Sequence, residues 1–133
     1  MLRWGIVGTG DISHRLVSDL LATGDRISAV WGRTTDRASD FASRYGIPSS
    51  TDDRSALFSR DDVDIVYIAT PAVTHTAITL EALDAGKHVL VEKPIATSVA
   101  DAETLFAHAA EADVFLMEAM WMRFNPLHVE IID

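Results

Sequence analysis

Residues 2–13 read LRWGIVGTGDIS, and this stretch decides the fold of the 133-residue chain. An apolar run that ends at Val7 predicts a buried strand, Gly8 and Gly10 predict a tight turn, and helical spacing begins at Asp11. Glycines let the backbone turn sharply against a ligand, while the start of a helix presents unpaired N–H groups and its positive dipole end. The stretch therefore predicts a strand, a turn and a helix that together can hold a pyrophosphate.

The glycine spacing matches most of the dinucleotide-binding fingerprint. The pattern is Gly-x-Gly-x-x-Ser, so Ser13 occupies the place where the fingerprint has Gly or Ala for close packing of helix on strand. Serine is small enough for that place. The alternative interpretation is a strand-to-helix turn without a ligand. The candidate cofactor-binding residues of this turn are Gly8, Thr9, Gly10, Asp11 and Ile12.

Composition narrows the class of protein. With 48% apolar and 23% charged residues, the chain is typical of an ordinary globular domain. A net charge of -9 argues against binding to nucleic acid and to anionic membranes. The chain has no cysteine, and its histidines and acids lack metal-ligand spacing, so no disulfide and no metal site is expected. No apolar run has the length of a signal peptide core or a membrane span, and we expect a cytoplasmic location.

Strand and helix patterns alternate along the whole chain. This order predicts a doubly wound, parallel α/β sheet of the Rossmann type. The almost wholly apolar run at residues 63–69 is typical of a strand covered on both faces, so we place it near the centre of the sheet. In the first helix we expect Ile12, Leu16, Leu20 and Leu21 to form the buried face. The predicted strands are residues 2–7, 27–31, 47–50, 63–69, 87–91 and 114–117.

The end of the second strand carries Arg33 instead of an acidic residue. In this fold an acid there binds the adenosine ribose hydroxyls and selects NAD, whereas an arginine accommodates the additional phosphate of NADP. Arg37 lies one helical turn further on and can add a second cation, with Thr34 between them. The pattern favours NADP over NAD. The alternative is that both arginines are solvated residues at the start of a helix.

Several motifs together resemble the Gfo/Idh/MocA oxidoreductases. The most specific is AGKHVLVEKP at residues 85–94, in which Glu92-Lys93-Pro94 follows a strand. The segment at residues 117–124 resembles the branch with dimeric dihydrodiol dehydrogenases and related sugar dehydrogenases. The remaining motifs are the glycine turn, Arg33, the tripeptide Ala69-Thr70-Pro71 with His75, and the tripeptide Met117-Glu118-Ala119.

The resemblance implies two domains. Residues 1–119 would form the dinucleotide-binding Rossmann domain, and residues 120–133 would begin the link into a second α/β substrate domain that is absent from this sequence. That second domain usually forms a subunit interface, so a homo-oligomer is expected. The apolar segment 120–124 would be poorly covered without further protein.

The resemblance also implies the chemistry of the EKP element. Hydride transfer needs a group that takes or gives the substrate hydroxyl proton, and Lys93 is the candidate, placed near the nicotinamide ribose. The alternative is that Lys93 only clamps cofactor or substrate. Pro94 would fix the loop, and we hypothesise a cis bond before it. Glu92 would hold this loop or bind a ribose hydroxyl.

Five further candidates surround this element. Thr70 and Pro71 are expected to line the nicotinamide half of the site, and His75 is either a contact to the cofactor or an ordinary helix residue. Trp121 and Arg123 resemble positions near the nicotinamide and the substrate, where a tryptophan can stack and an arginine can bind hydroxyls. The alternative for both is packing at a domain boundary.

Two classes of function fit these features. The first is an NAD(P)-dependent oxidoreductase, with NADP favoured, that transfers a hydride between the nicotinamide and a sugar, polyol or cyclic diol. The second is a dinucleotide-binding sensor or regulatory module without catalysis. A hydrolase on a similar sheet is excluded because the chain has no Gly-x-Ser-x-Gly turn.

Overall fold

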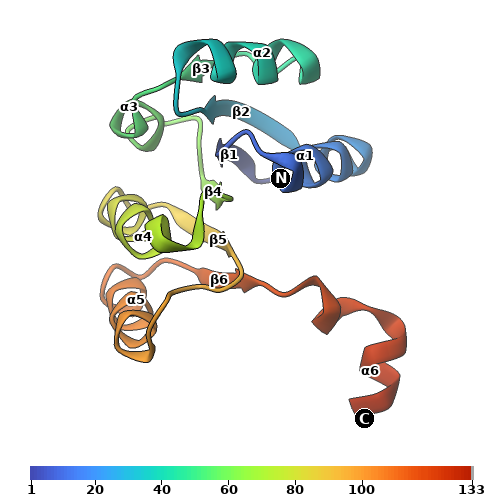
Figure 1. Cartoon of the computed structure of the whole chain (residues 1–133), viewed down its shortest axis with the longest axis vertical. Helices are drawn as coiled ribbons and strands as arrows, with labels where there is room; N and C mark the ends of the chain where they lie inside the picture. The colour runs from blue at the N-terminus through green and yellow to red at the C-terminus, as the bar shows by residue number, and fades with distance from the viewer. Residues whose placement is uncertain (133) are drawn as a thin grey trace.

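The β-branched and apolar runs of the sequence form a parallel sheet of six strands, in a computed structural model that describes residues 1–132 (Figure 1). The order across the sheet is β3-β2-β1-β4-β5-β6. The chain therefore starts at the centre, moves outward through β2 and β3, returns to β4 and moves outward on the other side. The strands are β1 (Arg3–Val7), β2 (Arg26–Trp31), β3 (Ser50–Thr51), β4 (Ile65–Ile68), β5 (His88–Glu92) and β6 (Leu116–Ala119).

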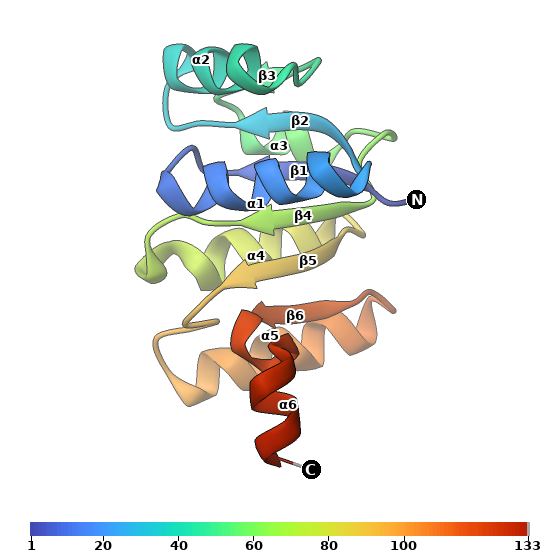
Figure 2. The ribbon, with the colours of Figure 1, turned by 90° about the vertical axis from the view of Figure 1, so that its right-hand side faces the viewer.

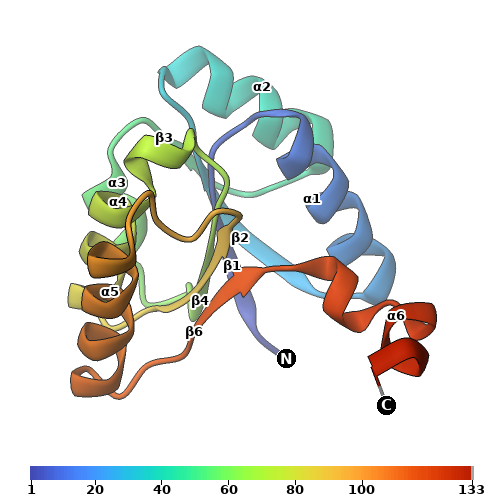
Figure 3. The ribbon, with the colours of Figure 1, turned by 60° about the horizontal axis from the view of Figure 1, so that its bottom comes forward.

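Helices cover both faces of the sheet (Figure 3). One apolar cluster joins α1 and α2 to the sheet through residues such as Val17, Phe41 and Tyr67. A second cluster joins α3, α4 and α5 to the other face through residues such as Leu83 and Leu105. The helices are α1 (Asp11–Thr23), α2 (Thr35–Tyr45), α3 (Arg54–Phe58), α4 (His75–Asp84), α5 (Val99–Glu111) and α6 (Pro126–Ile132), with short 3-10 turns η1 (Ala72–Thr74) and η2 (Trp121–Phe124).

The predicted architecture is confirmed. Each predicted strand has a counterpart, and β4 lies beside β1 at the centre of the sheet, where all four of its residues are buried. The last strand is displaced by two residues and runs from Leu116 to Ala119. Parallel strands on either side of the β1/β4 switch leave a crevice at their carboxyl ends, which is where ligands bind in open α/β sheets.

The expected buried face of α1 is wrong at two positions. Ile12 and Leu21 are 39% and 42% exposed, whereas Ser13, Val17 and Leu20 face the sheet. The small side chain of Ser13 is completely buried, so the helix packs closely at this point and its contact face is rotated by one residue. Ile12 is thereby directed away from the core.

The segment after β6 projects from the body of the sheet (Figure 2). Large apolar side chains lie exposed along η2 and α6, including Trp121 and Phe124 at 66% each. Asp133, the last residue of the predicted link, lies outside the described residues. Among residues 1–132, none of the helices combines the length and the apolar composition that crossing a bilayer requires.

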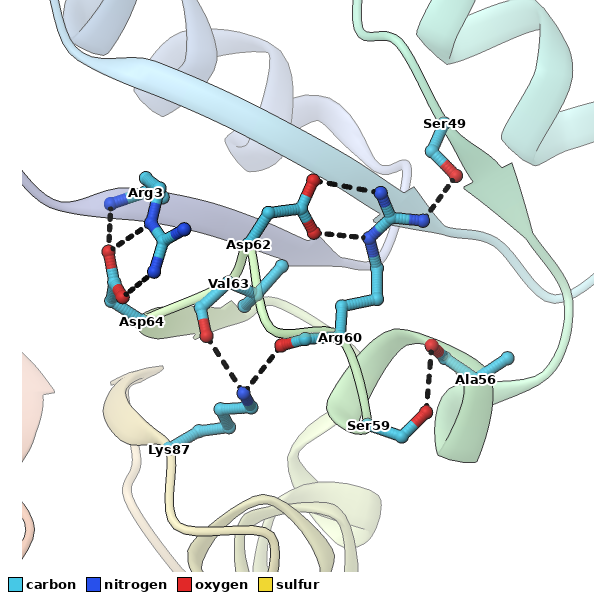
Figure 4. A network of polar contacts seen from close by, with 9 residues as sticks. All are labelled: Arg3, Ser49, Ala56, Ser59, Arg60, Asp62, Val63, Asp64 and Lys87. Atoms are coloured by element: carbon cyan, nitrogen blue, oxygen red, sulfur yellow. Dashed lines mark hydrogen bonds and ion pairs between the residues drawn. The ribbon is translucent and has the colours of Figure 1, made fainter.

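A polar network ties the strands together at their amino ends, opposite the crevice (Figure 4). The guanidinium of Arg3 on β1 donates two hydrogen bonds to the carboxylate of Asp64, which directly precedes β4, at 2.9 and 2.6 Å. The ammonium of Lys87, just before β5, donates to the backbone carbonyls of Arg60 and Val63 at 2.7 and 2.8 Å. The starts of the three central strands are therefore fixed to one another.

We predict a pH-dependent loss of stability for Asp64→Asn. The Arg3 hydrogen bonds hold the pKa of Asp64 well below its usual range in the folded protein. A lowered pKa stabilises the fold above the unfolded value of about 4, and this contribution is lost as pH falls further. The variant should therefore melt below the wild type at pH 7, and the difference should shrink below about pH 4.

The matched control is Asp61→Asn, which makes the same charge change at an exposed neighbour. Thermal unfolding followed by circular dichroism across this pH range checks the prediction. A difference for Asp64→Asn that stays constant with pH would contradict it.

Candidate functional site

The glycine turn begins at the carboxyl end of β1, which lies between β2 and β4 in the sheet. Gly8 has φ of 114°, and its N–H donates to the carbonyl of Trp31 on β2 at 3.0 Å. A Cβ atom built on Gly8 would lie 2.7 Å from the carbonyl oxygen of Ala69, at the end of β4. Both the conformation and the contact exclude any side chain here. Gly8 is therefore needed for the chain to leave β1 in this direction.

Gly10 serves a different purpose. It is the N-cap of α1 with φ of -82°, and no side chain caps the helix. A Cβ on Gly10 would meet nothing within 4 Å, so the space in front of the first turn of α1 is open. Uncapped N–H groups at a helix start, facing open space, form a ready site for an anion. The residues at this turn fit a bound pyrophosphate.

One hollow lies on the α2 side of the turn, and we name it the Arg37 hollow. It has a volume of about 290 Å³. Arg37 and Arg44 both face it from α2, so the hollow is lined by two cations that the phosphate of a nucleotide would meet. Its lining residues are Thr9, His14, Arg37, Asp40, Phe41 and Arg44.

A second hollow, the Lys93 hollow, lies on the other side of the turn, above β4 and β5. Its volume is about 310 Å³. The structure here brings together residues from the ends of two strands, the start of α1 and η2. It is lined by Ile12, Ala69, Thr70, Ala72, His75, Glu92, Lys93 and Trp121.

His75 is buried beneath this hollow, with 1% of its surface exposed. Its Nδ1 lies 2.7 Å from the carbonyl oxygen of Pro94, and its Nε2 lies 2.8 Å from the carbonyl oxygen of Thr70. The imidazole therefore joins the loop after β5 to the loop after β4. This link between loops is a third role for His75, which the sequence did not indicate, and the contact to the cofactor stays a prediction.

Glu92 has a partner that sequence reasoning missed. The hydroxyl of Tyr67 on β4 donates to Oε1 of Glu92 at 2.6 Å, from a side chain that is 1% exposed. Burial raises the pKa of Tyr67, and the Glu92 carboxylate raises it further, so the phenol stays protonated and donates. The only signal in the sequence is one polar tip in an otherwise apolar strand.

Glu118 on β6 is the second residue that sequence reasoning left without a role. Its Oε1 accepts a hydrogen bond from the backbone N–H of Ile95 at 2.9 Å. A carboxylate at the end of an apolar strand was the available signal for Glu118, but nothing in the sequence indicates which amide it holds.

The loop that Glu118 holds contains the bond between Lys93 and Pro94. This bond is cis, as hypothesised.

The remaining candidates do not all meet at these hollows. Arg33 is exposed in the turn between β2 and α2, and the hydroxyl of Thr34 accepts from the N–H of Arg37 at 3.3 Å as the N-cap of α2. Pro71 directly precedes η1 and does not line the Lys93 hollow, whereas its neighbour Thr70 does. Arg123 is exposed on η2 and lines neither hollow.

A third, apolar hollow of about 490 Å³ adjoins the Lys93 hollow on the α1 face. It lies between α1, β5, β6 and η2. Ile12, Glu92 and Trp121 line both hollows, so the two lie side by side. Trp121 therefore lies between the apolar face and Lys93.

Comparison with known proteins shows where this chain has relatives. A family model described as "Oxidoreductase family, NAD-binding Rossmann fold" matches residues 2–120. The trans-1,2-dihydrobenzene-1,2-diol dehydrogenase of Xenopus tropicalis is 36% identical over 132 residues, which is 97% of this chain and 40% of that protein. The dTDP-3,4-didehydro-2,6-dideoxy-alpha-D-glucose 3-reductase of Actinomadura kijaniata is 40% identical over 134 residues, which is 99% of this chain and 40% of that protein.

Solved structures agree with this relationship. A 3-ketoreductase from Actinomadura kijaniata, in complex with NADP and TDP-benzene, superposes with a TM-score of 0.92 at 40% identity. The match covers 98% of this chain and 40% of that protein. The chain thus spans about 40% of the length of these curated relatives.

We predict that Gly8→Ala destabilises the fold much more than Gly10→Ala. At Gly8 the added methyl group would meet the Ala69 carbonyl in a conformation that L residues rarely adopt, and the free energy of unfolding should fall by about 2 kcal/mol or more. At Gly10 the methyl group enters open space, so the loss should be smaller. Urea unfolding of both variants measures the difference. Equal losses would contradict the role assigned to Gly8.

Proposed function

The chain belongs to the Gfo/Idh/MocA oxidoreductase family, and from this membership and the geometry of the crevice we propose that it binds NADP for hydride transfer to or from a sugar, polyol or cyclic diol. One observation carries the proposal. The turn at Gly8 and Gly10 lies between two hollows, one lined by Arg37 and the other by Lys93. A dinucleotide has this layout, with a pyrophosphate at its middle and a nucleoside at each end.

At the centre of the crevice we propose that the pyrophosphate binds the start of α1, against Gly8, Thr9, Gly10, Asp11 and Ile12. The open space in front of Gly10 supports this placement, because the phosphates can approach the backbone N–H groups without meeting a side chain. The thirteen-residue helix α1 adds the positive end of its dipole.

At the adenosine end we propose that Arg33, Thr34 and Arg37 select NADP. Arg37 faces the hollow beside the glycine turn. Arg33 is exposed just after β2, at the position where an acidic residue would select NAD. Two cations at this position suit the additional phosphate of NADP. The relative from Actinomadura kijaniata in complex with NADP, at 40% identity, supports the same choice.

At the other end we propose that Thr70, Pro71, His75, Glu92 and Lys93 form the nicotinamide side of the site. The bound cofactor supplies or accepts the hydride. The ammonium of Lys93 would give a proton to the substrate oxygen during reduction, and the amine would take it back during oxidation. Trp121 borders the same hollow and would exclude water from the reacting atoms, while Arg123 would bind substrate hydroxyls.

Substrate class and domain limits belong to the same proposal. The two relatives are named for a dihydrodiol and for a dTDP-linked deoxysugar, which share vicinal oxygens on a six-membered ring. We propose residues 1–119 as the dinucleotide-binding domain, supported by the end of β6 at Ala119, and residues 120–133 as the start of a link to a substrate domain. A cytoplasmic location and a homo-oligomer stay predictions.

We predict that Arg33→Asp weakens NADPH binding at least about tenfold more than NADH binding, because the new carboxylate repels the additional phosphate and suits a free ribose hydroxyl. Titrations followed by nicotinamide fluorescence measure both affinities. Arg26→Asp makes the same charge change at an exposed position on the opposite edge of the sheet and should alter neither affinity. Equal losses of NADPH and NADH affinity in Arg33→Asp would show that Arg33 does not contact the phosphate.

We predict that Lys93→Met removes turnover while keeping most cofactor binding. In the natural protein, NADPH oxidation with a keto-sugar or a diketone should fall by about a hundredfold or more, because methionine cannot donate the proton. The affinity for NADPH should fall by about tenfold at most, the cost of one lost hydrogen bond to the cofactor. Full turnover in the variant would refute proton transfer by Lys93. NADPH binding by the wild type without turnover of any such substrate would favour the regulatory alternative.

A further inference from the structure

The loop that follows β5 begins where the hydrogen-bonded pairing of β5 with β6 ends. The ladder between β5 and β6 ends with the pair of Glu92 and Ala119, and Lys93 comes directly after it. Pro94 has no N–H group, so Ile95 offers the first backbone donor after Lys93 that another residue can bind. The direction of Lys93 therefore depends on how Glu92 and Ile95 are held on either side of it.

Glu118 holds the Ile95 side of this loop. It is paired with Val91 on β5 and shares the face of β6 on which Leu116 packs into the cluster under α5. From there its half-buried carboxylate accepts the N–H of Ile95 at 2.9 Å, in place of a ladder hydrogen bond. A hydrogen bond to a carboxylate is stronger than one between neutral groups. Both partners are also attached to packed parts of the structure, because Glu118 lies on β6 and the side chain of Ile95 packs against the cluster under α5.

Tyr67 holds the Glu92 side from the opposite face of the sheet. Its buried hydroxyl donates to Glu92 at 2.6 Å, and the second Glu92 oxygen lies 3.3 Å from the backbone nitrogen of Lys93. Lys93 thus stands between two anchors, one on each face, while its own side chain is exposed in the Lys93 hollow. A third contact, from Nδ1 of His75 to the carbonyl oxygen of Pro94 at 2.7 Å, holds the middle of the loop and is kept when either anchor is removed. Removing either anchor frees the backbone on one side of Lys93.

We infer that Glu118 is a positioning residue for Lys93, acting through the Ile95 amide and touching neither cofactor nor substrate. The inference rests on the proposed function, because it assigns the held lysine to the nicotinamide side of the site. Its physical basis is the hydrogen bond from the Ile95 amide to Glu118, which links the loop to β6 although the two residues are 23 positions apart in the sequence.

The test separates the local hydrogen bond from its effect on the cofactor. The variants of the full chain are Glu118→Ala, Glu118→Gln, Lys93→Ala and the double variant, with Glu103→Ala on the exposed face of α5 as the matched control. Hydrogen exchange of the Ile95 amide, measured by NMR, reports on the anchor. Affinities for NADPH and for 2',5'-ADP report on the whole cofactor and on its adenosine half.

Glu118→Ala should speed exchange of the Ile95 amide by about tenfold or more, because the amide loses its only carboxylate acceptor in the described structure. NADPH affinity should fall by about fivefold, within the range expected for the net loss of one ordinary hydrogen bond, because Lys93 is displaced but still present, and 2',5'-ADP affinity should stay unchanged. Glu118→Gln, whose amide oxygen still accepts, should restore both. In the Lys93→Ala background, Glu118→Ala should cost no further NADPH affinity.

Three results would overturn the positioning role. They are equal losses for NADPH and 2',5'-ADP, additive losses for the two substitutions, and a Glu118→Ala variant that exchanges and binds like the wild type. A wild-type chain that binds neither ligand would instead overturn the proposed function, and the role of Glu118 with it. The two failures are therefore distinguishable in one set of titrations.

Discussion

The backbone of Gly8 lies so close to the end of β4 that no side chain can stand between them. The N–H of Ala69 donates to the carbonyl of Val7 at 2.9 Å, so the two central strands stay paired until the turn begins. This close approach places the start of α1 directly beside the loop that leaves β4. Every other feature of the crevice lies around this point. A side chain at Gly8 would push apart β1 and β4, and the two hollows lie on either side of the turn between these strands.

Rigidity is distributed unevenly between the two edges of the sheet. At the amino edge, Arg3 and Lys87 tie the starts of β1, β4 and β5 through hydrogen bonds to a carboxylate and to backbone carbonyls. At the carboxyl edge the buried ring of His75 joins the loop after β4 to the loop after β5. Fixed strand starts leave the loops at the other edge free to differ in sequence, as functional loops on a rigid scaffold do.

The sequence was sufficient for the architecture because periodicity and glycine position are local signals. The strand at residues 63–69 could be read from adjacent residues alone. What failed was the buried face of α1, where the choice between Ile12 and Ser13 depends on how closely the helix approaches the sheet. The partners of Glu92 and Glu118 were invisible for the same reason. They join residues 25 and 23 positions apart, and one sequence carries no record of such contacts.

The two ends of the crevice differ in how firmly their cations are held, and the chemistry explains the difference. Arg33 and Arg37 are exposed on a turn and a helix start, and attraction between a guanidinium and a phosphate tolerates some freedom of position. Proton and hydride transfer tolerate far less, since a displacement of about 1 Å can cost a hundredfold in rate. The loop that carries Lys93 is accordingly held from both faces of the sheet, by Tyr67 and by Glu118. Under the proposed function, a chain with a net charge of -9 would draw its affinity for an anionic cofactor from these few local cations and from the start of α1, so their placement is the property that the fold has to supply.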